Sequence, residues 1–162
     1  MKGLVYKSTG SWYSVRSETG DMYDCKIKGK LRLKNINSTN PVVVGDIVEF
    51  VVEEYDLQQI GIIQKIHDRR NYILRKSVNL SKQTHILASN IDLLLLVITI
   101  KNPITTTSFI DRFLVSAEAY SIKTILVFNK CDIYDKNDEI LLNLFINTYE
   151  SIGYDTIKTS TF

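Results

Sequence analysis

The first 68 residues alternate short runs of apolar and polar positions with turn residues between them. None of these runs shows the three- and four-residue spacing of an amphipathic helix. Runs of period two separated by glycine-containing turns are typical of β-strands. Five strands are expected, at residues 3–8, 12–17, 21–33, 46–54 and 58–66. They predict an all-β OB-fold barrel over residues 1–68, and an SH3-like barrel or an open meander is the alternative.

From residue 91 the pattern changes to that of an α/β sheet, and residues 69–90, which have no clean period, are expected to form a linker. Residues 92–100 are a continuous apolar run, which favours a strand buried on both faces of a parallel sheet. A second buried strand is predicted at 124–128 and a third at 154–160.

Two helices are predicted between these strands, and the resulting β-α-β-α-β order over residues 91–162 indicates a parallel sheet with right-handed crossovers. The first helix is expected at 106–121, with the stripe Phe109, Ile110, Phe113, Leu114, Ala117 and Tyr120. The second helix is expected to begin at a cap formed by Asp135 or Asn137 and to end at Gly153. Its predicted buried face is Ile140, Leu141, Leu144, Phe145, Thr148, Tyr149 and Ile152.

Charge divides the chain at the same place. Residues 1–90 carry 14 Lys and Arg against 9 Asp and Glu, whereas residues 91–162 carry 6 against 9. A basic half joined to an acidic half suggests two modules with different partners.

No apolar stretch is long enough for a membrane span, and the N-terminus lacks the apolar core of a signal peptide. We therefore expect a cytoplasmic protein with no membrane partner, in which Cys25 and Cys131 are unpaired thiols. His67 and His85 stand alone in the sequence, so no metal site is expected.

The third predicted strand carries a cation at every second position: Lys26, Lys28, Lys30, Arg32 and Lys34. Alternate residues of a strand share one face. Like charges this close repel one another, and a polyanion relieves that repulsion by displacing counterions. We expect this face to contact RNA, with an ordinary solvated face as the alternative. Candidate stacking surfaces for bases lie in the neighbouring strands, at Trp12, Tyr13 and Tyr23.

An Asn-Lys-x-Asp motif, Asn129, Lys130 and Asp132, follows the second buried strand. Guanine presents a ring N–H and an amine side by side, and the Asp132 carboxylate would accept both in charge-assisted bonds. Adenine lacks this pair of donors. The Lys130 stem would cover the base plane, and Asn129 would tie the loop to a neighbouring segment. The alternative is an ordinary β–α loop with these side chains in solvent.

The motif lies where ligands of such sheets bind, outside the carboxyl ends of the strands. A second guanine contact is expected from the loop after the third strand, at Thr159 and Ser160.

A phosphate-binding G-x-x-x-x-G-K-[ST] loop is absent from the 162 residues. Gly29-Lys30 is followed by Leu31, and Asp24 occupies the place of the first glycine. Either the order of the motifs is permuted, so that this loop would follow residue 162, or the fold never had one.

Six stretches together resemble the RsgA family, the circularly permuted GTPases of bacterial small-ribosomal-subunit maturation. They are CKIKGKLR, VVGDIVEF, GIIQKIHDRRNYILR, ASNIDLLLLVITIKNP, FIDRFLVSAEAY and ILVFNKCD. Their order also agrees, and the resemblance covers essentially all of residues 1–160. It implies an OB-fold followed by part of a P-loop GTPase-like sheet in which the guanine motif precedes the P-loop.

The resemblance further implies binding of ribosomal RNA by the OB-fold and hydrolysis of GTP to GDP on the small ribosomal subunit. Mg²⁺ would accompany the nucleotide, and the family's C-terminal domain would hold one structural zinc. The family's guanine motif maps onto Asn129, Lys130 and Asp132, whereas Thr159-Ser160 departs from the usual Ser-Ala. Catalytic residues are not identified.

Without a P-loop, we expect this chain alone to be inactive and to bind GTP weakly. The complete protein is expected to be a monomer. The strand at 92–100 is expected to have an open edge, through which the chain self-associates or which the linker or a neighbouring molecule covers. The alternative function is that of a non-enzymatic RNA-binding OB-fold module with a degenerate α/β appendage.

Overall fold

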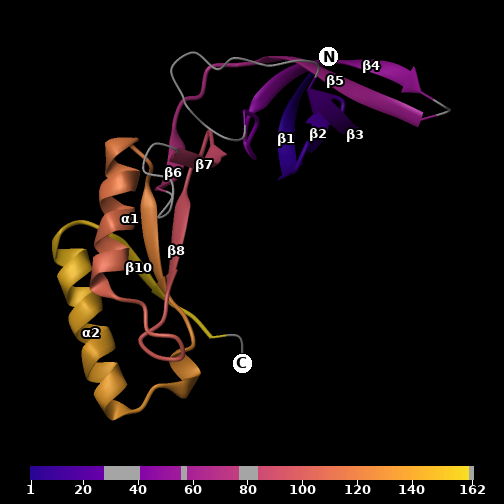
Figure 1. Ribbon diagram of the computed structural model, residues 1–162. Coiled ribbons are helices and arrows are strands. Elements are labelled where there is room, and N and C mark those ends of the chain that lie inside the picture. The colour runs from indigo at the N-terminus through magenta and orange to yellow at the C-terminus, as the bar shows by residue number, and fades with distance from the viewer. Residues whose placement is uncertain (28–40, 56–57, 77–83, 161–162) are drawn as a thin grey trace. The chain divides into compact units, whose positions relative to one another are not determined.

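Five strands close into a barrel in the order β1-β2-β3-β5-β4, which confirms the predicted OB-like architecture (Figure 1). This computed structural model describes residues 1–27, 41–55, 58–76 and 84–160. Only β3 and β5 pair in parallel within the described barrel, and the other strand pairs are antiparallel. The strands are β1 (Lys2–Thr9), β2 (Trp12–Ser17), β3 (Met22–Ile27), β4 (Ile47–Tyr55) and β5 (Gln58–Ile66).

Alternate side chains of these strands fill the barrel, as the period-two pattern predicts. Tyr13 of β2 lies opposite Cys25 of β3, and both point inward. Burial raises the pKa of the Cys25 thiol to about 12, so Cys25 acts as a small apolar packing residue. The buried core comprises Val5, Tyr13, Val15, Cys25, Val42, Val48, Phe50 and Ile63.

A two-stranded sheet forms within residues 69–90, the segment expected to be a linker. β6 (Tyr72–Lys76) pairs antiparallel with β7 (Thr84–Ser89), and the Ser89 N–H donates to the Val44 carbonyl at 2.9 Å. Gly45 has a φ of +89°, and a Cβ at this position would lie 2.0 Å from the Ser89 carbonyl oxygen. Only glycine allows this close approach. The hairpin therefore belongs to a unit that spans residues 1–91.

A fully buried carboxylate, Asp46, holds the barrel and the hairpin together. Arg69 donates from Nε and from one terminal nitrogen to the two Asp46 oxygens, each at 2.6 Å. The Ser89 hydroxyl donates to Asp46 at 2.6 Å, and the Val43 N–H donates to it at 2.9 Å. Paired, charge-assisted hydrogen bonds of this kind compensate a carboxylate for the loss of water. We call Asp46, Arg69 and Ser89 the ionic cluster.

The second unit, residues 92–162, has the predicted β-α-β-α-β order. Its strands are parallel in the order β10-β9-β8, and α1 and α2 lie on the same side of them (Figure 1). The elements are β8 (Leu94–Ile98), α1 (Thr107–Ala119), β9 (Thr124–Phe128), the 3₁₀ turn η1 (Cys131–Ile133), α2 (Lys136–Ser151) and β10 (Asp155–Lys158). Their shared core comprises Leu96, Ile98, Ile100, Ile110, Leu114, Leu126, Phe128, Tyr134, Leu142, Ile146 and Tyr149.

The prediction that the first strand of this sheet is buried on both faces is wrong. In β8, Leu96 and Ile98 are buried, whereas Leu95 and Val97 are 55% and 56% exposed. Both helices pack on the face that holds Leu96 and Ile98, so the opposite face stays open. Within the described residues, β8 is also an edge strand.

The predicted buried face of α2 is right at Tyr149, which is buried, and at Phe145, which packs against the core, but it is wrong at most other positions. The helix buries Leu142, Ile146 and Tyr149, and Ile140, Leu144 and Ile152 of the predicted stripe are exposed. Both sets have helical spacing, so periodicity alone does not select between them. The helix ends are as predicted: Asp135 is the N-terminal cap, and Gly153 has a φ of +96° just beyond the C-terminal cap. Neither α1 nor α2, nor any other helix of the described residues, is long and apolar enough to cross a membrane.

Arg69→Met is expected to lower the free energy of unfolding of the first unit by about 3–5 kcal/mol, because it leaves the buried Asp46 carboxylate without its cation. Native-state hydrogen exchange of the β4 and β5 amides measures this loss. Lys65→Met is the matched control, since Lys65 pairs with Glu49 at an exposed position and a much smaller effect is expected. Equal protection of these amides in both variants would show that the ionic cluster does not stabilise the barrel.

Candidate nucleotide-binding site

Parallel pairing of β9 with β10 brings the two predicted guanine loops to one edge of the sheet. Ile125 lies opposite Asp155, and Phe128 lies opposite Lys158. The Thr159 N–H then donates to the Phe128 carbonyl at 2.8 Å, which extends the pairing by one step. Both loops therefore start at the carboxyl ends of neighbouring strands, where ligands of such sheets bind.

Hydrogen bonds connect the two loops directly. The Thr159 hydroxyl donates to the side-chain oxygen of Asn129 at 3.2 Å, and the Ser160 hydroxyl donates to the Asp132 carboxylate at 2.5 Å. The Cys131 N–H donates to the Thr159 carbonyl at 3.2 Å. The residues predicted to contact guanine thus form one cluster: Asn129, Lys130, Asp132, Thr159 and Ser160. Their contact with guanine stays a prediction.

Lys130 connects this cluster to the loop that follows β8. Its φ of +63° is left-handed, and its Nζ donates to the carbonyl of Asn102. Lys101, which precedes Asn102 in the same loop, contacts Asp135 and Asp138 at the start of α2. The hydrogen bond to Asp138, more than any other contact, raises the pKa of Lys101. The loop after β8, which the sequence does not single out, is therefore a wall of the site.

Tyr134 holds the Asn-Lys-x-Asp loop in place, and it is likewise not part of the sequence motif. Its buried hydroxyl donates to the Asn129 carbonyl at 2.5 Å and accepts from the Ile100 N–H at 2.9 Å. Burial raises the pKa of Tyr134, so the hydroxyl keeps the proton that it donates. Tyr134 lies two residues after Asp132 and just before the cap of α2, and nothing in the sequence marks it, so only its contacts identify it.

The cluster suits a ligand that carries adjacent hydrogen-bond donors. The Asp132 carboxylate is exposed and is oriented by Ser160, so it is able to accept two parallel bonds from one flat molecule. A G-x-x-x-x-G-K-[ST] sequence for the phosphates does not occur among the 162 residues. The described residues also hold no group of three or more His, Cys, Asp or Glu suited to a metal ion.

The predicted RNA-contact face is described only at its first cation. Lys26 places its Nζ 4.0 Å from the ring centroid of Trp12, and Trp12 is 41% exposed. Tyr13 is buried in the barrel core, whereas Tyr23 is half-buried and packs on Phe50. The other predicted cations, Lys28, Lys30, Arg32 and Lys34, lie outside the described residues.

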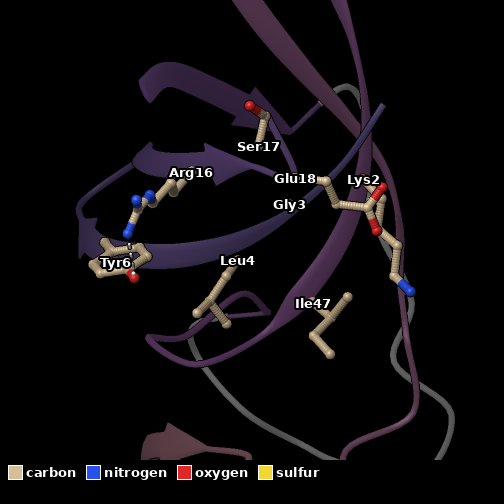
Figure 2. A pocket seen from close by; sticks show the side chains of 8 residues that line it. All are labelled: Lys2, Gly3, Leu4, Tyr6, Arg16, Ser17, Glu18 and Ile47. Atoms are coloured by element: carbon tan, nitrogen blue, oxygen red, sulfur yellow. Dashed lines mark hydrogen bonds between the residues drawn. The ribbon is translucent and has the colours of Figure 1, made fainter. Parts of the chain in front are cut away.

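A separate hollow of about 360 Å³ lies on the outside of the barrel (Figure 2). Figure 2 shows the Arg16 guanidinium reaching the Tyr6 hydroxyl, with Leu4 beside them, and this contact is 3.5 Å long. The lining residues Lys2 and Glu18 have opposite charges. Because its charges are mixed, this hollow is a weaker candidate for a polyanion than a uniformly basic strand.

Both parts of the chain match known protein families. Residues 2–63 match the family model described as RsgA N-terminal domain, and residues 66–162 match the one described as RsgA GTPase. Two curated relatives, from Flavobacterium psychrophilum and Christiangramia forsetii, are named small ribosomal subunit biogenesis GTPase RsgA. They are 57% and 56% identical over 99% of this chain, which corresponds to 49% and 51% of their own lengths. The chain thus spans about half the length of the curated relatives it matches.

Two solved structures share the fold along nearly the whole chain. YjeQ from Thermotoga maritima superposes with a TM-score of 0.68 at 33% identity and covers 98% of this chain. YloQ, described as a circularly permuted GTPase, superposes with a TM-score of 0.62 at 27% identity and covers 99%. In both cases the match takes in 51% of the other chain.

Tyr134→Phe is expected to destabilise the second unit by about 1–3 kcal/mol, because it leaves the buried Ile100 N–H without its partner. Thermal or urea unfolding followed by far-ultraviolet circular dichroism measures this change, since the described helices α1 and α2 lie in the second unit. Tyr154→Phe, which removes an exposed hydrogen bond to Glu118, is the control, and a smaller effect is expected. An unchanged unfolding midpoint for Tyr134→Phe would remove the hydroxyl from its supporting role.

Proposed function

This chain belongs to the RsgA family, and on that premise we propose that it is part of a cytoplasmic GTPase that acts in maturation of the small ribosomal subunit. The observation that carries this proposal is the cluster of Asn129, Asp132, Thr159 and Ser160 at one edge of the sheet. An Asn-Lys-x-Asp loop tied by side-chain hydrogen bonds to the loop of the next strand has the residue types and placement that guanine recognition requires.

In this proposal Asp132 selects guanine over adenine. Its two carboxylate oxygens accept from the ring N–H and the exocyclic amine of the base, and Ser160 holds the carboxylate in position for them. An adenine base would leave the carboxylate poorly paired. A site built to hydrogen-bond one group of its ligand strongly rejects an analogue that lacks that group.

Lys130, Asn129 and Tyr134 shape the site around the base. The Lys130 stem runs toward the Asn102 carbonyl and would cover one face of the purine. The Asn129 side-chain oxygen accepts hydrogen bonds from the Thr159 hydroxyl and the Lys130 N–H. Asn129 therefore positions the loop and does not contact the base through this oxygen. Tyr134 holds the same loop through the Asn129 carbonyl.

Of the steps of GTP binding and hydrolysis, we assign only base recognition to this chain. Holding the β- and γ-phosphates and Mg²⁺ requires a P-loop, and no such sequence occurs among the 162 residues. GTP hydrolysis would therefore depend on a further part of the polypeptide. By itself the chain is proposed to bind guanine nucleotides weakly and not to hydrolyse them, and calorimetry that gave micromolar affinity for the isolated chain would contradict this.

The barrel is proposed to bind ribosomal RNA through the predicted basic strand at residues 25–34, of whose cations the structure describes Lys26. Lys26 and Trp12 present a cation and an aromatic ring together on the surface, a combination that suits a backbone phosphate next to an unstacked base. The same observation supports the second candidate function, an RNA-binding module without enzymatic activity. A G-x-x-x-x-G-K-[ST] sequence after residue 162 in the gene would favour the enzyme, and a stop codon there would favour the module.

Asp132→Asn in the complete protein is expected to weaken GTP binding by about 1.5–3 kcal/mol for each charge-assisted bond that it removes. It should at the same time improve binding of xanthine nucleotides, whose base accepts where guanine donates. Competition of GTP and XTP for a fluorescent nucleotide measures both effects. Asp155→Asn makes the same chemical change at the start of β10, at the other end of the strand, and is expected to change neither. Unaltered guanine preference in Asp132→Asn would remove this residue from the site.

Neutralising Lys26, Lys28 and Lys30 together, as methionines, is expected to weaken binding of ribosomal RNA. The slope of log K against log salt should fall by roughly 2, since each lost phosphate contact with a single strand contributes about 0.7. Neutralising Lys123, Lys136 and Lys158 in the second unit removes the same charge and is expected to leave that slope nearly unchanged. If both triple variants give the wild-type slope, the basic strand is only a solvated face.

A further inference from the structure

A groove of about 500 Å³ lies between the C-terminal halves of α1 and α2, apart from the nucleotide cluster. Its floor is formed by Leu114 and Tyr149, which are buried in the core of the second unit. Val115 and Ile152 line it as well, and they are 70% and 64% exposed. Large apolar side chains gathered at a concave surface are typical of a docking site, whereas isolated exposed apolar residues need no explanation.

Two carboxylates, both on α1, lie beside this apolar floor. Asp111 and Glu118 of α1 line the groove, and each accepts a hydrogen bond from a tyrosine, Asp111 from Tyr149 at 2.9 Å and Glu118 from Tyr154 at 3.2 Å. Both carboxylates are exposed and keep further lone pairs for an incoming donor. Burial, followed by the hydrogen bond to Asp111, raises the pKa of Tyr149 to about 12, so this tyrosine adds no positive or negative charge of its own.

The ends of the two helices make the groove still more electronegative. The C-terminus of a helix carries a partial negative charge that cations stabilise, and neither α1 nor α2 has a basic residue in its last turn. Instead, Glu118 and Glu150 lie near these ends. Lys123, the first cation after α1 in the sequence, pairs with Asp155 at 3.3 Å.

We propose that this groove binds a polypeptide segment in which an apolar side chain is flanked by Lys or Arg, supplied by a basic protein partner. The apolar side chain would cover Val115 and Ile152, and the basic groups would pair with Asp111, Glu118 and the helix ends. RNA does not fit, because its phosphates would face these carboxylates. A second α/β unit of this chain is also disfavoured, because residues 92–162 carry nine acidic and six basic side chains. This proposal does not depend on nucleotide binding by the Asp132 cluster.

The test uses the 162-residue chain and two labelled synthetic peptides, one of Leu and Lys at helical spacing and one in which Glu replaces each Lys. Fluorescence anisotropy at low salt is expected to show binding of the Lys peptide only. Amide chemical shifts on its addition should change at residues 111–119 and 149–154. Equal binding of both peptides, binding of neither, or shifts confined to other residues would overturn the proposal.

Val115→Lys removes an apolar contact and adds a repelling charge, so it is expected to weaken binding of the Lys peptide about tenfold or more. Ile140→Lys is the matched control, because Ile140 is an equally exposed apolar residue of α2 outside the groove; a change of less than about twofold is expected. Glu118→Gln keeps the shape of the groove and should flatten the salt dependence of binding. Equal effects of Val115→Lys and Ile140→Lys would overturn the proposal.

The other possible occupant of the groove is the basic barrel of a second copy of the chain. Sedimentation equilibrium of the chain without peptide tests this possibility. The proposal predicts that Val115→Lys leaves the association state of the chain unchanged. A dimer that is present in the wild-type chain and in Ile140→Lys but is lost in Val115→Lys would assign the groove to self-association and overturn the proposal.

Discussion

Parallel pairing of β9 with β10 is the constraint on which the candidate site depends. It places the carboxyl ends of both strands at one edge, so that the loop at Asn129 and the loop at Thr159, which are 30 residues apart, meet through the bonds Thr159–Asn129 and Ser160–Asp132. Tyr134 then fixes the Asn129 loop against β8 through two backbone groups. The residues of the motif are local in sequence, but their arrangement follows from the order of the strands.

A different interaction organises the first unit. The ionic cluster ties the loop before β4 to the residues on both sides of the β6–β7 hairpin. Asn71 continues this arrangement, because its side chain donates to the Ile91 carbonyl at 2.8 Å and accepts from the Ile91 N–H at 2.6 Å. The chain is therefore held by specific hydrogen bonds up to the last residue of the unit. Residues 69–90, the segment expected to form a linker, therefore belong to the barrel unit.

Elements with regular local patterns could be predicted from the sequence, and elements that depend on distant partners could not. The barrel strands, the α/β order, the Asp135 cap and the Gly153 ending all follow from period, turn residues or capping chemistry. The sequence of the β6–β7 hairpin has no clean period. The hairpin is stabilised instead by contacts of Arg69 and Ser89 with Asp46, which is more than 20 residues away along the chain. The exposed face of β8 and the orientation of α2 depend on which neighbours cover them, and an apolar run does not contain that information. Within the site, the motif identified Asp132 and its neighbours, whereas Tyr134 and the Lys101–Asn102 loop are recognisable only from their contacts.

The placement of Trp12 has a practical consequence for studies of the molecule. It is the only tryptophan in the chain, and it lies on the surface of the barrel with an ammonium group over its ring. Light absorbed selectively by indole is therefore emitted from the first unit alone, and the α/β unit is dark at that wavelength. The intensity and colour of this emission provide a label-free optical probe of the barrel surface, built into the protein by its own sequence.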